Sequence, residues 1–255
     1  MTTVVAAVTA YRRTEYIGEA LRSIDRQTSP PDRVVVASDF RPVDGIRNGD
    51  WIRVTGAPQG PRVAEIARRT EGYDVIAFLD DDDTWEPGKI AAVRSAFDSD
   101  RVSFFNRAHA EFFDGVPAKR PLWKILRDFR GGFTRVDGIQ YYGNSSCMAV
   151  RRSAIVPYLS VLDAMDLAID DALFWLSTTT GAVVTSALPL SRLRIHAANS
   201  SRAADAPARR TLAGRRLVTY RILDGCVGGR YRAEFVSKFR EIASAYERAA
   251  REAAR

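Results

Sequence analysis

The sequence predicts an α/β fold in which a mostly parallel central sheet is flanked by helices and followed by a C-terminal helical extension. Short apolar runs alternate with segments in which apolar residues recur every three or four positions. These patterns are typical of buried strands and of amphipathic helices. Strands that are apolar along their whole length suit a parallel sheet covered on both faces. The extension is predicted because the chain from about residue 203 onward is rich in Ala, Arg and Glu.

The N-terminal half shows the alternation most clearly. Apolar runs predict strands over residues 2–10, 33–38, 51–55 and 75–79. Apolar positions at helical spacing predict three helices, marked by Ile17, Ala20, Leu21 and Ile24, by Val63, Ile66, Ala67 and Thr70, and by Ile90, Val93 and Phe97. Pro87 precedes the third helix, where its missing N–H costs little.

The pattern changes after a predicted strand at 102–106. Further segments predict a hairpin arm over 108–119, a basic aromatic segment over 120–135, a strand over 144–150, a helix over 170–180 and strands over 182–186 and 190–196. We expect one catalytic domain over residues 1–201 and a basic helical extension over residues 202–255.

Composition indicates a globular cytoplasmic protein. The chain is 46% hydrophobic and 27% charged, with no apolar run long enough for a membrane span. A strand-like run begins almost at Met1, so we expect no signal peptide. Cys147 and Cys226 share no metal-like spacing with each other or with a histidine, which favours reduced thiols.

The positive charge is concentrated near the C-terminus. Residues 202–255 hold thirteen Arg and Lys against six Asp and Glu, a difference of seven that equals the net charge of +7. Together with the basic aromatic stretch 119–130, this tail predicts peripheral docking at the anionic inner face of a membrane. The alternatives are a solvated helical face and a homodimer formed through the C-terminal helices. We expect no nucleic-acid partner.

Four consecutive aspartates, Asp80–Asp83, directly follow the apolar run 75–79. Two like charges about 4 Å apart repel by about 4 kcal/mol at an effective dielectric constant near 20, so the cluster needs a positive partner or full solvation. Ligands of open α/β sheets bind at the carboxyl ends of the strands, and hard divalent cations prefer carboxylate oxygens. The alternative is that Asp83 or Thr84 only caps the helix that contains Pro87.

Two enzyme classes fit an acidic cluster in this place. Asp80-x-Asp82-x-Thr84 has the arrangement of a haloacid-dehalogenase-type phosphatase nucleophile, but three predicted strands precede it and no later Gly-Asp-x-x-x-Asp motif follows. The wider pattern "VTAYRRTEYIGEALRSIDRQT…RVVVASDF…GPRVAEIARRTEGYDVIAFLDDDDTWEPGKI" resembles glycosyltransferase family 2, which has the Rossmann-like GT-A fold. The resemblance runs from Thr3 to about Ser201.

The resemblance implies an inverting, metal-dependent transfer from a nucleotide sugar, with a UDP-sugar expected. It implies that the nucleotide sugar is bound by Thr9, Tyr11, Arg12, Asp39, Arg62, Asp80, Asp81 and Arg194, and that Mn²⁺ or Mg²⁺ is held by Asp82 and His196. Gly60-Pro61-Arg62-Val63 departs from the family's Ala-Arg-Asn pattern because it lacks the Asn. His196 also remains open to the alternative of a phosphate donor or an ordinary loop histidine.

The resemblance also implies a general base at the head of the helix that begins near residue 170. Asp171 matches the family's base and Asp170 stands beside it; without the family, helix capping is the simpler interpretation. Asn144, Ser145 and Trp123 are candidate acceptor-binding residues, although the aromatic residues could equally belong to the core. The expected acceptor is a glycan or a lipid-linked sugar in polysaccharide or glycolipid assembly. The alternative from another class is a non-catalytic nucleotide or polyanion binder on the same fold.

Overall fold

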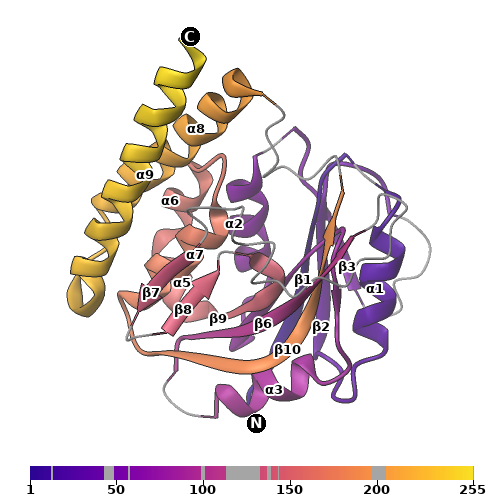
Figure 1. Ribbon diagram of the computed structural model, residues 1–255. Coiled ribbons are helices and arrows are strands. Elements are labelled where there is room, and N and C mark those ends of the chain that lie inside the picture. Colours follow the sequence, from indigo (N-terminus) through magenta and orange to yellow (C-terminus); the bar gives the residue numbers. More distant parts are fainter. Residues whose placement is uncertain are drawn as a thin grey trace.

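The computed structural model describes residues 1–12, 14–42, 49–56, 58–98, 101–112, 133–136, 139–142, 144–196 and 205–254. At its centre is an eight-stranded sheet in the order β3 (Gly49–Arg53), β2 (Arg33–Ser38), β1 (Val4–Ala10), β4 (Val75–Asp80), β9 (Met148–Arg151), β6 (Ser103–Phe112), β10 (Val183–Ile195) and β5 (Thr84–Trp85). Within this sheet, β9 and β5 run antiparallel to their neighbours and the other pairings are parallel (Figure 1). The predicted mostly parallel α/β fold is confirmed.

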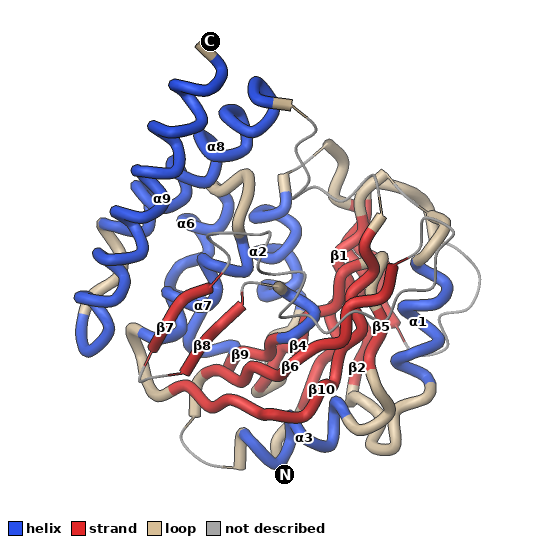
Figure 2. Tube along the Cα trace, in the orientation of Figure 1, coloured by secondary structure: helices blue, strands red, loops and turns tan. Residues whose placement is uncertain are grey.

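Helices cover both faces of the sheet (Figure 2). Residues of β1 alternate between the faces, and Val5 and Ala7 pack in one buried cluster whereas Val4 and Val8 pack in the other. The first face is covered by α2 (Gln59–Arg69), α5 (Arg152–Ile155), α6 (Leu159–Asp163) and α7 (Ile169–Thr178), and the second by α1 (Ile17–Asp25) and α3 (Lys89–Ala96). Because β1 is buried on both faces, it is apolar along almost its whole length.

The C-terminal extension is a helical hairpin of α8 (Ala206–Asp224) and α9 (Arg232–Ala253), which lies beside the helices of the first face (Figure 1). Its buried residues Leu217, Tyr220 and Phe235 belong to the same apolar cluster as the first face of the sheet. The hydrophobic core is therefore continuous between the sheet and the hairpin. The predicted boundary at residue 201 falls outside the described residues. Among the described helices, none is long and apolar enough to cross a membrane.

Several elements differ from the expectation. The two predicted strands 182–186 and 190–196 form one strand, β10, whose register with β6 shifts on either side of Pro189; a proline cannot donate a ladder hydrogen bond, so a bulge accommodates it. The short β5 and a separate hairpin of β7 (Phe133–Val136) and β8 (Ile139–Tyr142) were not predicted. The predicted arm begins inside β6, and the rest of the arm, with most of the basic aromatic segment, lies outside the described residues.

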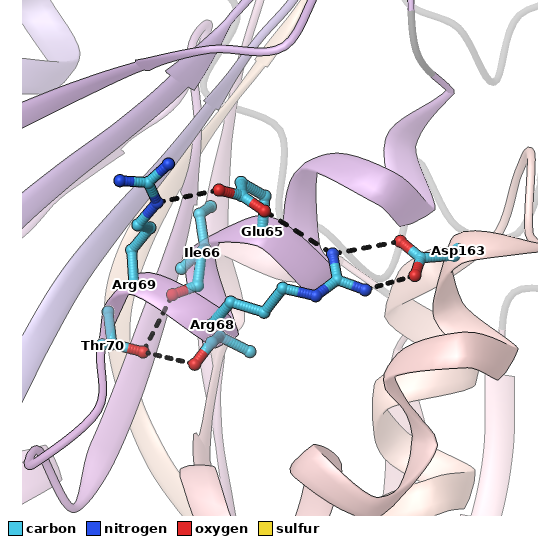
Figure 3. Close-up of polar contacts among 7 residues, drawn as sticks. Glu65, Ile66, Arg68, Arg69, Thr70 and Asp163 are labelled. Carbon is cyan, nitrogen blue, oxygen red and sulfur yellow. Dashed lines mark hydrogen bonds and ion pairs between the residues drawn. The ribbon is translucent and has the colours of Figure 1, made fainter.

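A close contact between α2 and α6 fixes the start of α2 near the carboxyl edge of the sheet. A Cβ atom on Gly60 would lie 2.1 Å from the carbonyl oxygen of Leu162 and 2.5 Å from that of Met165, so only glycine permits this approach. At the other end of α2, the Arg68 guanidinium lies between Glu65 and Asp163, the last residue of α6 (Figure 3). Thus α2 is clamped against α6 at both ends.

We predict that Gly60→Ala lowers the free energy of unfolding by about 1–3 kcal/mol, the usual cost of overpacking, because the added methyl group must push backbone atoms apart. Urea unfolding followed by circular dichroism measures the change. Gly18→Ala is the matched control, since its Cβ would approach only the flexible Arg22 side chain, at 3.4 Å, and we expect no loss of stability because alanine is the better helix former. Equal stability of the two variants would contradict the tight α2–α6 contact.

Candidate functional site

The polar residues predicted from sequence meet at one edge of the sheet, where β1, β2 and β4 end. Thr9 is in register with Asp80, and Ala10 with Ser38. The residues that follow these three strands therefore lie side by side, and they include Tyr11, Arg12, Asp39 and Asp81–Asp83. This is the edge at which open α/β sheets bind ligands.

Each of the four aspartates is held differently, and the first two fasten β4 to its neighbours. The Asp80 carboxylate accepts hydrogen bonds from the Thr9 hydroxyl at 3.0 Å and from the Ser145 hydroxyl at 2.7 Å. The Asp81 carboxylate accepts from the main-chain N–H of Tyr11 at 3.3 Å, while its own N–H donates to the carbonyl of Thr9. Asp81 is 4% exposed, so these contacts replace water around its charge.

The next two aspartates bind the end of β10. Asp82 Oδ2 lies 3.0 Å from His196 Nε2, and both side chains are buried. Asp83 accepts from the Ser146 hydroxyl at 2.6 Å and from the main-chain N–H of Arg194 at 2.8 Å. Burial, with the nearby charges of Asp82 and then Asp80, raises the pKa of Asp83 well above its usual range. The residue that caps α3 is Gly88, so the alternative of a simple helix cap by Asp83 or Thr84 is wrong.

Ser146 supports the segment Asp80–Asp83, which we call the aspartate turn. Its hydroxyl accepts from the main-chain N–H of Asp80 at 3.0 Å, in addition to its bond to Asp83. Its carbonyl oxygen accepts from the Trp85 indole at 3.0 Å, the Ser191 hydroxyl at 2.6 Å and the Lys89 ammonium at 3.4 Å. Burial lowers the pKa of Lys89 to about 7. Sequence reasoning missed the support from Ser146, because nothing in its local pattern links it to the aspartates.

Arg62 is the most unusual cation of the site. Its side chain is 3% exposed, and its Nε and one terminal nitrogen have no hydrogen-bond partner among the described residues. The guanidinium lies over the Tyr11 ring, 4.3 Å from the ring centroid. Burial lowers the pKa of Arg62, whereas Asp39, Tyr11 and Asp81 oppose that effect. Burial of a cation with unused donors costs free energy, so the surroundings of Arg62 are suited to a ligand that brings a hydrogen-bond acceptor or a negative charge.

The backbone beside Arg62 is also strained. Arg12 adopts a left-handed conformation with φ of 59°, which is uncommon for a residue other than glycine and concentrates at functional sites. The Asp39 carboxylate holds it there by accepting from the Arg12 N–H at 2.9 Å. The Arg12 guanidinium lies 4.6 Å from the centroid of the Tyr11 ring. Tyr11, at 37% exposed, therefore contacts two guanidinium groups with its ring.

Arg194 fastens the end of β10 to α1 and to the aspartate turn. Its Nε donates to the carbonyl of Asp82 at 2.9 Å, and its guanidinium pairs with Glu19. The same guanidinium lies over the Tyr16 ring, which in turn contacts the His196 ring with centroids 5.2 Å apart. The structure thus places Arg194 and His196 at the site, and adds Glu19 and Tyr16, which sequence reasoning missed.

The second acidic pair lies in the first turn of α7. The residue that caps α7 is Ala168, so neither Asp170 nor Asp171 is the N-cap residue, although both lie in the first turn of the helix. Asp171 accepts two hydrogen bonds from Arg216 of α8, at 3.0 Å and 2.7 Å. Asp170 accepts from the N–H of Asp171 at 3.0 Å. Burial, followed by the charge of Asp171, raises the pKa of Asp170 to about 7, and Asp80 adds to the rise.

Asp82 and His196 fit the expected divalent cation as a two-residue anchor. Their facing oxygen and nitrogen atoms are 3.0 Å apart, so one ion could contact both. Carboxylate oxygens suit Mn²⁺ and Mg²⁺, and a neutral imidazole is a common metal ligand. Among the described residues, no group of three or more His, Cys, Asp or Glu side chains could hold a metal ion. Such a site fits a cation that takes its remaining ligands from substrate phosphates and water, as Mg²⁺ commonly does.

The candidate acceptor residues are only partly placed. Ser145 donates to Asp80 and thereby supports the aspartate turn. Asn144 precedes it, and its buried Oδ1 has no partner within the described part of the chain. Trp123 lies outside the described residues, as does the whole stretch 119–130 that was predicted to dock on a membrane. Their roles stay predictions.

Comparison with known proteins supports the fold. No family model matches the sequence, and no curated protein matches it. Among solved structures, S. aureus TarS residues 1–349 in complex with UDP-GlcNAc aligns with a TM-score of 0.59 and 12% identity, over 97% of this chain and 83% of that one. The mannosyltransferase PcManGT from Pyrobaculum calidifontis, in complex with GDP-Man and Mn²⁺, aligns with a TM-score of 0.60 and 16% identity, over 98% and 74%. The chain therefore shares the α/β fold of these glycosyltransferases.

We predict that Asp170→Asn changes the pH dependence of stability. The pKa of Asp170 is about 7 in the folded protein, against an ordinary value of 3.8, so the folded parent binds this proton more tightly than the unfolded chain does. Its contribution to stability is complete below about pH 4 and is lost as the pH rises through about 7. The Asn variant, which keeps the acceptor oxygen, lacks this loss. Between pH 5 and pH 8 its free energy of unfolding should gain about 1–3 kcal/mol relative to the parent.

Urea unfolding at several pH values measures this gain. Asp166→Asn is the control, because Asp166 is half exposed and pairs at the surface with Arg215. We expect its effect on stability to be constant over the same pH range. A gain of the same size in both variants, or none in Asp170→Asn, would show that the pKa of Asp170 is not raised in the folded protein.

Proposed function

We propose that the protein is a glycosyltransferase that moves a sugar from a nucleotide-sugar donor, with a UDP-sugar expected, to an acceptor hydroxyl with inversion at the anomeric carbon. The observation that carries the proposal is the buried Arg62, whose unused donors lie beside Tyr11, Asp39 and the aspartate turn at the carboxyl edge of the sheet. The solved structures with the same fold add support, because their ligands include UDP-GlcNAc and GDP-Man.

The nucleotide is proposed to occupy the corner formed by the ends of β1, β2 and β4. The part of the Tyr11 ring that the two arginines leave exposed would contact the base. Asp39 would accept from a base N–H, and Asp81 would accept from a ribose hydroxyl. Arg62 would donate to the nucleotide, which restores the hydrogen bonds that its buried guanidinium lacks in the protein alone.

The divalent cation is proposed to join this site through Asp82 and His196. When bound, it would supply Lewis-acid stabilisation of the negative charge that develops on the departing diphosphate. The protein's own residues hold the anchor ready, since Arg194 fixes the backbone of Asp82 and Tyr16 packs against His196. A preorganised pair loses little conformational entropy when the ligand arrives.

The base of the reaction is proposed to be the Asp170–Asp171 pair acting as one unit. The acceptor hydroxyl forms a bond to the anomeric carbon, the bond to the diphosphate breaks, and the hydroxyl proton passes to a carboxylate. The family resemblance favours Asp171, but two hydrogen bonds from Arg216 already engage one oxygen of that carboxylate. Asp170 has a pKa raised to about 7, which suits a base near neutral pH. We therefore propose that Asp170 receives the proton and that Asp171 is held by Arg216.

The alternative of a non-catalytic nucleotide binder predicts the same corner without a need for the acidic pair. The raised pKa of Asp170 favours catalysis, because perturbed carboxylates concentrate at active sites. The phosphatase interpretation requires Asp80 as a nucleophile, yet its two oxygens accept from Thr9 and Ser145. The acceptor is proposed to be a glycan or lipid-linked sugar in polysaccharide or glycolipid assembly.

We predict that nucleotide sugars raise the melting temperature, and that Mn²⁺ increases the effect. A thermal-shift series with UDP-, GDP- and dTDP-sugars, with and without Mn²⁺, measures donor choice, and release of the nucleoside diphosphate measures turnover. Asp82→Ala should abolish the Mn²⁺-dependent part of the shift, because the anchor loses its carboxylate, while the apo protein stays folded. If UDP with Mn²⁺ stabilises the variant as well as the parent, Asp82 does not hold the metal. Binding without any turnover would favour the non-catalytic alternative.

We predict that Arg62→Met weakens nucleotide binding by about tenfold or more, because a hydrogen bond to a charged group is typically worth about 1.5–3 kcal/mol. Isothermal titration with UDP measures the dissociation constant. The apo variant should be at least as stable as the parent, because the substitution removes a buried charge whose hydrogen bonds are incomplete. Arg69→Met on the same helix is the control, because Arg69 pairs with Glu65 at the surface (Figure 3). Unchanged affinity in Arg62→Met would refute the placement of the nucleotide.

A further inference from the structure

The C-terminal hairpin delivers a cation to the acidic pair of α7. Arg216 of α8 donates from Nε and from a terminal nitrogen to the same oxygen of Asp171. The Asp171 side chain is 3% exposed and that of Arg216 is 27% exposed, so this ion pair is largely shielded from water. Burial alone would lower the pKa of Arg216, but Asp171, followed by Tyr220 and Asp170, raises it overall.

Aromatic packing holds α8 in this position. The Trp175 indole of α7 donates to the Tyr220 hydroxyl at 3.3 Å. Phe235 of α9 packs edge-on against Trp175 with ring centroids 5.3 Å apart and stacks with Tyr220 at 5.7 Å. Such aromatic pairs contribute beyond the area that they bury. The hairpin is thus docked on α7 through an aromatic cluster that lies about one helical turn beyond the acidic pair.

Contacts of α8 with the turn before α7 add to this docking. The Thr219 hydroxyl donates to the carbonyl of Leu167 at 2.6 Å, and Arg215 pairs with Asp166. The next residue, Ala168, adopts a left-handed conformation with φ of 60° and caps α7. Because α8 holds both the turn that precedes α7 and the carboxylate of Asp171, its position determines how the head of α7 faces the sheet edge.

The charged and titratable groups around Asp171 come from several elements of the described chain. Asp170 is adjacent on α7, Arg216 and Tyr220 face it from α8, and Lys238 approaches from α9. On the sheet side, Asp80 at the end of β4 acts on Asp170. Burial lowers the pKa of Lys238, which also pairs with Glu241. Arg216 is the cation that the structure shows in hydrogen-bonding contact with Asp171.

We infer that Arg216 is a positioning residue for the transfer reaction, and that the α8–α9 hairpin is therefore a working part of the catalytic unit. The inference rests on the proposed function, because it assigns Arg216 a role through the acidic base pair. Arg216 neutralises and orients Asp171, which leaves Asp170 as the carboxylate that exchanges the proton. Arg216 lies outside the segment whose resemblance suggested the reaction, because it follows residue 201, where that resemblance ends.

The test is the pH profile of turnover in Arg216→Met, Arg216→Lys and the parent. Arg216 pairs with Asp171, and its nearby charge lowers the pKa of the adjacent Asp170. Loss of that charge should therefore move the acid limb of the kcat–pH profile upward by about one unit, at the low end of the usual effect of an opposite charge. Near pH 6.5 this corresponds to about a tenfold loss of kcat, with recovery in alkaline buffer. The KM for the donor should stay unchanged, because Arg216 does not line the nucleotide corner. Arg216→Lys, which keeps the charge, should restore most of the parental profile.

Arg221→Met is the matched control, because Arg221 lies on the same helix and is exposed. Its profile should coincide with that of the parent. A purely structural role for Arg216 would lower the melting temperature and the active fraction at every pH without moving the acid limb, and that result would overturn the inference. If Arg216→Met does not fold, the double variant Arg216→Met/Asp171→Asn takes its place, because it also removes the Asp171 charge that the loss of Arg216 leaves unpaired. Its pH profile is then compared with that of Arg216→Lys.

A second readout separates this inference from the proposed function. Carbon-13 NMR of labelled aspartate carboxyls follows the titration of Asp170 without substrate, with Asp170→Asn to assign the signal. The Asp170 midpoint should rise in Arg216→Met and stay near the parental value in Arg221→Met. An inactive parent with this NMR shift would refute the glycosyltransferase proposal and leave the electrostatic role of Arg216 intact. An active parent whose acid limb and NMR midpoint ignore Arg216 would refute the inference alone.

Discussion

Four consecutive carboxylates held together at the end of β4 are the constraint on which the rest of the structure depends. Neighbouring charges of the same sign repel, and burial adds a desolvation cost, so each aspartate requires its own partner. Those partners come from the ends of β1 and β10 and from Ser145 and Ser146 before β9. The carboxylates can be satisfied only when β1, β4, β9 and β10 are arranged as in the sheet, which links the stability of the site to the register of the fold.

Without a ligand, several charged groups of the site remain incompletely neutralised or hydrogen-bonded. Asp83 is shifted toward its neutral form, Asp82 faces the nitrogen of His196, and Arg62 retains unused donors under the Tyr11 ring. A nucleotide with a divalent cation would satisfy these groups together, because the cation neutralises carboxylates and the nucleotide accepts from the guanidinium. The acidic pair of α7 faces the same repulsion between neighbouring carboxylates, but a side chain of the protein relieves it. There, a protein cation, Arg216, neutralises one carboxylate and leaves the other with a raised pKa.

The prediction of the fold succeeded where the local pattern carried the information. The strand 33–38 and the helices around Ile17, Val63 and Ile90 were located closely, because continuous apolar runs and helical periodicity reflect burial on two faces or one. The prediction failed where pairing decides the structure. The two-residue β5 exists because it pairs with β10, and β10 continues past Pro189 because a bulge restores its register with β6. Neither feature leaves a periodic signal in its own segment.

The sequence by itself determined the fold class and most residues that meet at the sheet edge, because these residues follow the strands that place them there. It could not determine which carboxylate pairs with which partner. Asp83 and Arg194 are far apart along the chain, as are Asp171 and Arg216, and no local pattern connects them. Only the packing of β10 beside β6 and of α8 against α7 decides these pairs. The reason is physical: the charge state of a buried carboxylate depends on which cation or dipole lies within a few ångströms, and that distance is set by tertiary structure.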